Sequence, residues 1–446
     1  MKRLYATLLL CLLVFAAPLT SQVTPPFIGM GDSIGEGVQS ANASTVSQPA
    51  TYLSHFARQM GAPFALPLIQ SGPFGIIYSV SNRTRVDASV QGSNLSVSGA
   101  DVHSILYDRA GPLIEDETDL VLSPRTGSQI EIAETIRAPF QICWIGNNDL
   151  LGAVVSNWNH LDGSQVTPLA QFTADYGEVI RRLRAWQGKV VVANLPDVTQ
   201  IAWMFTPQDL VKFLGSAYGL PEGSYTTLPV MLLIKLGLND GGILQDPSYV
   251  LAPSELAAIR QRNLEFNQVI AQTAAQAGVP VVNIAGLFQY MVANPPMIGN
   301  VPITNKFQGG FFSLDGVHPS NIGHAVIANA FIATANQAFG LSIPPMGPGA
   351  LLAVAVGDPF IDWNQNLKVR GRPFTGLLET LGPFMGISGD FQEGAGSPRA
   401  LMVGPKIDKA AGEAFMREYF RLKGKPPATP WTSKDAITAM SDIFRL

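Results

Sequence analysis

The stretch FIGMGDSIGEGVQS, residues 27–40, is the feature around which the rest of the sequence can be organised. An apolar run of strand length ends at Gly31, and Asp32 and Ser33 follow directly, with further glycines on both sides. Such a pattern is typical of a buried strand that turns sharply into the next element. Ser33 would then stand at the carboxyl end of the strand, either as a nucleophile on a tight turn or as an ordinary hydroxyl in a glycine-rich loop.

Similar apolar runs recur along the chain and are separated by longer helical patterns. We expect strands over residues 26–31, 88–97, 139–146, 189–196 and 279–286. We expect amphipathic helices over residues 168–188 and 253–278. In the second helix, one face carries Leu256, Ile259, Phe266 and Ile270. This alternation indicates the α/β class, with a parallel sheet covered by helices.

Polar groups follow several of these strands. Ser33 follows the first strand, Gly99 follows the second, and Asn148 follows the third. Asp315 and His318 lie in the segment LDGVHPSNIGH, residues 314–324, just before the last strongly helical run of this part of the chain. Because parallel strands end at one edge of their sheet, and open α/β sheets place their sites there, we expect these five residues to meet.

The five residue types suit acyl transfer. A serine hydroxyl needs a base, and Asp315 lies close enough in sequence to fix the Nδ1 of His318 and leave its Nε2 to face Ser33. The backbone N–H groups of Ser33 and Gly99 and the side-chain amide of Asn148 are candidate donors to an oxyanion. Each feature alone has an ordinary structural meaning, as a turn cap, a tight-turn glycine or a helix N-cap. Their combination in this order is harder to explain by structure alone.

In four blocks that contain these residues, the chain resembles the GDSL-type, or SGNH, serine hydrolases. The matching blocks, in the family's order, are Gly31-Asp32-Ser33, the segment NLSVSG ending at Gly99, Gly146-Asn147-Asn148-Asp149 and Asp315-Gly316-Val317-His318. The resemblance covers about residues 26–340. It implies a flavodoxin-like three-layer α/β/α fold with a mainly parallel five-stranded sheet, and hydrolysis of ester bonds.

The resemblance also implies a role for each matching residue. It implies Ser33 as the nucleophile, His318 as the base and Asp315 as the group that orients the base. It implies an oxyanion hole made by Ser33, Gly99 and Asn148. We assign Asp32 to holding the turn rather than to proton transfer.

The same residues allow other interpretations. GDSIG also spells the nucleophile elbow of α/β-hydrolases, but Ser33 follows the first strand, which leaves no preceding loop for an oxyanion donor. A metal site of Asp315, His318 and His324 lacks a further ligand cluster, so we predict no metal and no cofactor. Two alternatives stay open: a carbohydrate O-acetyl esterase, and a non-catalytic envelope binding protein on the same fold.

The N-terminus predicts export. Lys2 and Arg3 precede an apolar segment that runs to Ala17, and small and polar residues follow. At about 14 residues this segment is short for a membrane span, so we interpret residues 1–21 as a signal peptide and expect no transmembrane span in the mature chain. The mature protein would be periplasmic or extracellular. Cys143 would be its only cysteine, which we expect to be buried and not nucleophilic.

Composition narrows the choice of partners. The 446 residues are 47% hydrophobic and 14% charged, with a formal net charge of -4, so there is no broad cationic surface to bind nucleic acid. We expect a small-molecule or lipid-like acyl ester as the substrate, and the sequence identifies no protein partner.

Three regions follow the signal peptide. We expect a hydrolase domain over residues 22–340, interrupted at 201–250 by an apolar insertion. That insertion is either an ordinary helical packing unit or a mobile lid over a lipid-binding cleft. Residues 341–446 form a C-terminal extension of unknown role, with helices expected near 408–423 and 433–446. For the last helix we expect Ser433 as the N-cap and an apolar stripe of Ile437, Met440 and Phe444.

Overall fold

The computed structural model describes residues 26–155, 165–299, 301–372, 375–389, 407–425 and 431–444. The predicted signal peptide, residues 1–21, lies outside these ranges. Within them, no helix combines the length and the apolar character needed to cross a membrane.

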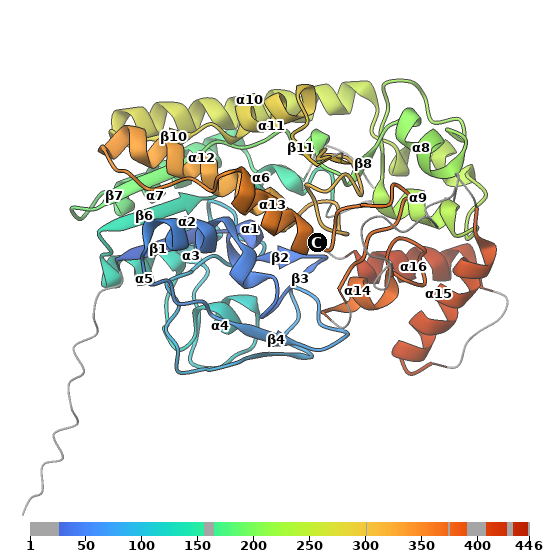
Figure 1. Ribbon diagram of the computed structural model, residues 1–446, viewed down its shortest axis with the longest axis horizontal. Coiled ribbons are helices and arrows are strands. Elements are labelled where there is room, and N and C mark those ends of the chain that lie inside the picture. Colours follow the sequence, from blue (N-terminus) through green and yellow to red (C-terminus); the bar gives the residue numbers. More distant parts are fainter. Residues whose placement is uncertain are drawn as a thin grey trace, which may run out of the picture.

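The α/β part of the molecule is built on a parallel sheet, whose strands lie at the left of Figure 1. In the described ranges its four strands, in spatial order, are β1 (Phe27–Gly31), β6 (Phe140–Trp144), β7 (Lys189–Ala193) and β10 (Val281–Val282). In β1 and β6 every residue is buried, as expected for a parallel strand covered on both faces. The predictions over 26–31, 139–146, 189–196 and 279–286 are therefore confirmed, with shorter bounds.

The fifth predicted strand, over residues 88–97, is wrong as a regular strand. The chain there runs beside β1 and makes one parallel bridge, between Gly29 and Asn94, with the Leu95 N–H donating to the Gly29 carbonyl at 2.8 Å. The side-chain oxygen of Asn94 accepts the backbone N–H of Ser96 at 3.2 Å, and such local side-chain bonds compete with a regular ladder. The side-chain nitrogen of Asn94 donates to the Gly35 carbonyl at 2.7 Å. The described sheet thus has four strands and an irregular edge. Counting that edge as the second strand gives the flavodoxin-like order 2-1-3-4-5.

Helices cover both faces of the sheet (Figure 1). They are α2 (Tyr52–Met60) and α12 (Asn321–Phe339) on one face, and α5 (Gln129–Ile136), α7 (Leu169–Leu183) and α10 (Pro253–Gln276) on the other. Tyr52 of α2 and Phe331 of α12 both pack on Trp144 of β6. Phe172 and Phe266 stack at 3.9 Å between α7 and α10. The predicted apolar face of residues 253–278 is buried, and the α/β class is confirmed.

Short elements connect these layers and carry the site. They are α1 (Ser33–Glu36), β2 (Val38–Gln39), β3 (Asn42–Ala43), β4 (Ile69–Ser71), β5 (Arg83–Arg85), α3 (Ser104–Tyr107), α4 (Glu117–Leu122), α6 (Asn148–Leu151), α11 (Ile284–Ala293), β11 (Met297–Ile298) and β12 (Val301–Pro302). Helix α1 follows β1 directly, and α6 begins soon after β6. Both therefore start at the carboxyl edge of the sheet.

The insertion packs against the end of the chain. It contains β8 (Met204–Phe205), α8 (Pro207–Leu214), β9 (Thr226–Thr227) and α9 (Leu228–Lys235). All residues of α9 are buried, and α9 packs on α8 and on the C-terminal helix α16 (Ser433–Ile443). Figure 1 shows this group of helices at one end of the molecule. The apolar side chains of α9 therefore form a core, and whether residues 201–250 move as a lid stays a prediction.

The C-terminal extension also contains α13 (Pro348–Gly357), α14 (Leu377–Leu381) and α15 (Lys409–Leu422). The prediction that Ser433 caps α16 is wrong, because Thr432 is the N-cap and its side chain accepts from the Asp435 N–H. Of the expected stripe, Met440 and Phe444 are buried, and the Phe444 ring meets Trp203 of the insertion edge-on at 5.7 Å.

Candidate active site

Ser33 is the first residue of α1 and is buried at the end of β1. The preceding Asp32 is the helix N-cap, and one of its carboxylate oxygens accepts the Ile34 N–H at 3.0 Å. Its other oxygen accepts the side-chain amide of Asn147 at 2.8 Å. Burial raises the pKa of Asp32 in spite of these bonds. Both oxygens of Asp32 are thus engaged in holding the turn, which is the role that we assigned to it.

Ser33, His318 and Asp315 form one hydrogen-bonded line. The Oγ of Ser33 is 2.8 Å from Nε2 of His318, and Nδ1 of His318 is 2.8 Å from Oδ2 of Asp315. Oδ1 of Asp315 accepts the backbone N–H groups of Val317 at 2.9 Å and His318 at 2.8 Å. Burial raises the pKa of Asp315, but the charge of His318 and these hydrogen bonds outweigh it and hold the pKa below its usual value. An ionised carboxylate therefore faces the imidazole.

The three candidate oxyanion donors are the first residue of α1, the first residue of α6 and Gly99, which lies in a turn. Among the described residues, the backbone N–H groups of Ser33 and Gly99 donate to no acceptor. The Asn148 amide donates one N–H to the Ala100 carbonyl at 2.8 Å, which orients it beside Gly99 and leaves its second N–H available. Gly99 has φ +79°, and a Cβ there would lie 2.6 Å from the ring of Tyr78, so only glycine fits.

A profile of the family described as GDSL-like Lipase/Acylhydrolase matches residues 28–331, and this span contains the whole candidate site. The chain belongs to this family. Membership implies ester hydrolase activity. No curated protein matches the sequence.

Several solved structures are similar to the chain at low identity. An acetylxylan esterase from Geobacillus stearothermophilus is 13% identical, with 71% of this chain and 95% of that chain covered and a TM-score of 0.35. An extracellular lipase from Streptomyces rimosus is 15% identical, with 70% and 98% covered and a TM-score of 0.33. An α/β hydrolase from the metagenome of Lake Arreo, Spain, is 12% identical, with 73% and 96% covered and a TM-score of 0.34. What those enzymes act on does not transfer to this chain.

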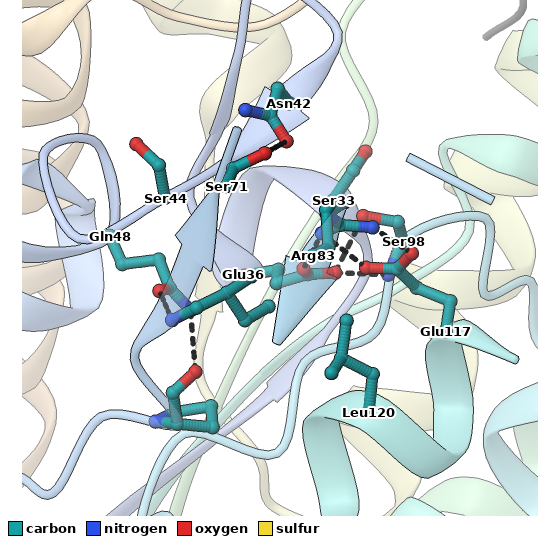
Figure 2. A network of polar contacts seen from close by, with 12 residues as sticks. Ser33, Glu36, Asn42, Ser44, Gln48, Ser71, Arg83, Ser98, Glu117 and Leu120 are labelled. Atoms are coloured by element: carbon teal, nitrogen blue, oxygen red, sulfur yellow. Dashed lines mark hydrogen bonds and ion pairs between the residues drawn. The ribbon is translucent and has the colours of Figure 1, made fainter. Parts of the chain in front are cut away.

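A buried ionic network, without a role in the sequence analysis, supports the Gly99 loop. Figure 2 shows Glu36 and Ser98 close to Ser33. One carboxylate oxygen of Glu36 accepts the backbone N–H of Ser98 at 2.7 Å and its hydroxyl at 2.5 Å. The guanidinium of Arg83 lies 3.6 Å from the other oxygen and also pairs with Glu117. Burial first, and then the charge of Glu117, raise the pKa of Glu36 well above its usual value.

Two further residues support the site and were not among the candidates predicted from the sequence. The amide of Gln129, at the start of α5, accepts the Gly31 N–H at 3.0 Å and donates to the Gly31 carbonyl at 2.9 Å, so it clamps the end of β1. Nothing in the sequence links two residues so far apart. Asn147 bonds Asp32 but received no role, although it stands beside Asn148 in the matching block. Its position next to a candidate site residue was the available signal.

The turn that carries Asp315 and His318 is packed against the insertion. Gly316 has φ +72°, and its carbonyl accepts the backbone N–H of Trp203 at 2.8 Å. A Cβ on Gly316 would lie 2.8 Å from that same nitrogen, so the two backbones approach too closely for any other residue. The indole N–H of Trp203 donates to the Val154 carbonyl at 2.8 Å, which fixes its own position. The start of the insertion therefore forms one wall of this turn.

The remaining candidate ligands and nucleophiles lie apart from this line. His324 is buried in α12, where its Nδ1 accepts the Tyr52 N–H at 3.3 Å and its ring stacks on Tyr52. In the described ranges, no three side chains of His, Cys, Asp or Glu are grouped so that they could hold a metal ion. Cys143 is buried in β6, and burial raises the pKa of its thiol to about 12. This thiol is thus a core side chain and not a nucleophile.

Proposed function

We propose that the protein is an exported serine hydrolase that cleaves carboxylic ester bonds, similar to carboxylesterases and lipases. The observation that carries the proposal is the continuous hydrogen-bonded line from Ser33 through His318 to Asp315. A serine hydroxyl 2.8 Å from an imidazole nitrogen, with a carboxylate on the other ring nitrogen, is the geometry that activates a weak nucleophile.

The proposed reaction has two steps. His318 Nε2 takes the proton of the Ser33 hydroxyl as Oγ forms a bond to the ester carbonyl carbon, and the carbonyl oxygen becomes an oxyanion. When the tetrahedral intermediate collapses, the C–O bond to the alcohol breaks and His318 returns the proton to the leaving alkoxide. Water then attacks the acyl-enzyme with His318 again as the base, and the acid leaves as Ser33 recovers its proton. Asp315 stays ionised and stabilises the imidazolium that forms in each step.

The proposed oxyanion hole consists of the Ser33 and Gly99 N–H groups and the Asn148 amide. Its support is that both backbone N–H groups have no acceptor in the described residues and that the amide is held by the carbonyl of Ala100, the residue after Gly99. Donors fixed before the reaction stabilise the developing charge without reorganising, and one such donor contributes about 100-fold or more to turnover.

A pocket beside Gly99 has charged side chains in its lining and supports a second candidate substrate. A cavity of about 290 Å³ adjoins Gly99 and is lined in part by Tyr78, Asp108, Asp116 and Thr118. Burial, followed by the charge of Asp101, raises the pKa of Asp108. The carboxylates and the hydroxyls of this pocket can bond a hydroxyl-bearing substrate, and Val97 and Ala100 line the pocket beside them. The apolar residues of α9 are used in packing. This supports a carbohydrate O-acetyl esterase as the alternative to a lipase-like enzyme.

Ester turnover by the purified mature chain tests both candidates. The parent, Ser33→Ala and His318→Ala would be compared on p-nitrophenyl esters from acetate to palmitate and on acetylated xylo-oligosaccharides. We expect turnover by the parent and a loss of at least about 1,000-fold in both variants. A preference for long acyl chains would support a lipase-like enzyme. A preference for acetylated sugars would support a carbohydrate O-acetyl esterase. A folded parent that cleaves none of these substrates would favour the non-catalytic binding protein.

Export is part of the proposal and rests on the N-terminal sequence. Residues 1–21 combine a basic start with a short apolar segment. Expression of the full chain in a secreting bacterial host, followed by N-terminal sequencing of the exported protein, tests it. Cleavage between about residues 17 and 22 is expected, and retention of Met1 on a cytoplasmic protein would contradict it.

A further inference from the structure

The hairpin of β2 and β3 has an unusual turn. Its two central residues, Ser40 and Ala41, have φ of 55° and 60°. Two-residue hairpin turns of this kind favour Asn-Gly, because a side chain in the left-handed region crowds its own backbone. A Ser-Ala turn in this conformation persists only where its surroundings hold it. The contacts of this turn therefore indicate its role in the structure.

The turn holds the candidate catalytic acid. The N–H of Ala41 donates to Oδ2 of Asp315 at 2.7 Å, the same oxygen that receives Nδ1 of His318. The N–H of Ser40 donates to the hydroxyl of Ser313, two residues before Asp315, at 2.9 Å. The other hydrogen bonds to this carboxylate come from Val317 and His318, in its own turn. Among the described residues, Ala41 is thus the one hydrogen-bond donor to Asp315 from elsewhere in the fold.

The C-terminal extension holds the turn in place. Glu379 of α14 is buried, and its Oε1 accepts the Ser40 hydroxyl at 2.8 Å. Its Oε2 accepts the backbone N–H of Arg372 at 2.7 Å. The side chain of Asn42, next to the turn, donates to the Thr375 carbonyl. These extension residues come after residue 331, where the family match ends.

A second contact ties the extension to the helix that follows His318. The guanidinium of Arg372 donates to the side chain of Asn321, the first residue of α12, at 2.9 Å and lies 4.9 Å from the ring centre of Phe360. Asp358 accepts the Ile322 N–H at 2.8 Å. The extension is therefore hydrogen-bonded both to the β2–β3 hairpin and to the start of α12, and these two segments flank the turn that carries Asp315.

We propose that the C-terminal extension positions the catalytic acid, with Glu379 as a positioning residue that holds the Ser40–Ala41 turn through the Ser40 hydroxyl so that the Ala41 N–H fixes Asp315 against His318. The inference rests on the proposed function, because it concerns the acid of the proposed triad. Glu379 bonds the Ser40 hydroxyl and the Arg372 N–H, and it acts on Asp315 through the Ser40–Ala41 turn. Its loss is therefore expected to lower kcat and leave KM near that of the parent.

The test uses the mature full-length chain and four variants: Glu379→Ala, Ser40→Ala, their combination, and Thr380→Val. Thr380 is the matched control, since it follows Glu379 in α14 and its hydroxyl docks the same helix by donating to the Pro73 carbonyl at 2.6 Å. Ser40→Ala removes a hydroxyl and leaves the backbone turn, so it carries the test if Glu379→Ala does not fold. The readouts are kcat and KM on the best ester and the rate of labelling by a fluorophosphonate.

We expect Glu379→Ala and Ser40→Ala each to lower kcat and the labelling rate about tenfold, with KM nearly unchanged. The double variant should be no slower than the worse single variant, since both changes break one connection. Thr380→Val should match the parent.

Three results would overturn the inference. They are a parent-like kcat in Ser40→Ala, equal losses in Glu379→Ala and Thr380→Val, and additive losses in the double variant. A parent that neither turns over esters nor reacts with the probe would overturn the proposed function itself, and the inference would fall with it. An active parent with unaffected variants would overturn the inference alone.

Discussion

Replacing Glu36 by alanine should reduce catalysis without changing any residue of the proposed triad. The change deletes the carboxylate that accepts both the backbone N–H and the hydroxyl of Ser98, at 2.7 and 2.5 Å. A buried donor that is left without an acceptor costs about 1–3 kcal/mol, and the change leaves two such donors on Ser98. Removing a buried carboxylate from beside Glu117 offsets part of this loss, and Arg83 keeps its pair with Glu117. We therefore expect a loss of about 2–4 kcal/mol in the free energy of unfolding.

The effect on kcat follows from the position of Gly99, the residue after Ser98. Deleting an oxyanion donor lowers kcat by about 100-fold or more, and a loosened donor lowers it by less. We expect Glu36→Ala to reduce kcat between about 10- and 100-fold with little change in KM. Ser98→Ala keeps the backbone N–H bond to Glu36, so its kcat should lie between that of Glu36→Ala and that of the parent.

The assay is p-nitrophenyl acetate hydrolysis at a temperature where urea titration shows each variant to be folded. A folded Glu36→Ala with the kcat of the parent would refute the reasoning that this network aligns the Gly99 donor.

Three further predictions concern other parts of the site. Asn148→Ala removes the amide held by Ala100 and should lower kcat about 100-fold in steady-state ester hydrolysis, and a parent-like kcat would exclude it as a donor. Gly316→Ala should lower the free energy of unfolding by at least about 1 kcal/mol in urea titration, because φ is +72° and the new Cβ would meet the Trp203 backbone at 2.8 Å; unchanged stability would contradict this close approach. Burial, followed by the charge of Asp101, raises the pKa of Asp149 from 3.8 to about 7. Between these values the folded chain binds a proton that the unfolded chain has released, so stability falls as pH rises, by up to ~4 kcal/mol for this group. Urea titrations from pH 4 to pH 8 should show the parent losing stability relative to Asp149→Asn, and parallel curves would contradict this.

The sequence predicted the parts of the fold and site that depend on local patterns. Buried parallel strands are nearly continuous apolar runs, so β1, β6 and β7 could be located from the runs of apolar residues in the sequence. The candidate residues Ser33, Gly99, Asn148, Asp315 and His318 could be brought together because each follows a strand or closes the last βα unit. The prediction of Ser433 as the N-cap of α16 was wrong because Thr432 and Ser433 are both good capping residues. The side chain of Asp435 forms a capping box with Thr432 and so decides between them.

What the sequence could not predict depends on contacts between distant residues. Glu36 stands in the quoted stretch, but its partners Ser98, Arg83 and Glu117 are separated from it by loops without pattern. The irregular edge beside β1 was missed because its alternating residues fit a strand, while the side chain of Asn94 accepts the backbone N–H of Ser96 two residues further on. The link from Glu379 to Ser40 joins a segment outside the family match to the first hairpin, and no spacing rule predicts such a contact.

The identity of the nucleophile is tested most directly by locating a covalent adduct. The mature chain would be treated with a fluorophosphonate, digested, and examined by peptide mass spectrometry, with Ser33→Ala and His318→Ala treated in parallel. We expect one modified serine, Ser33, no adduct in Ser33→Ala, and greatly slowed modification in His318→Ala. An adduct on another serine, or equal labelling of the parent and Ser33→Ala, would contradict it.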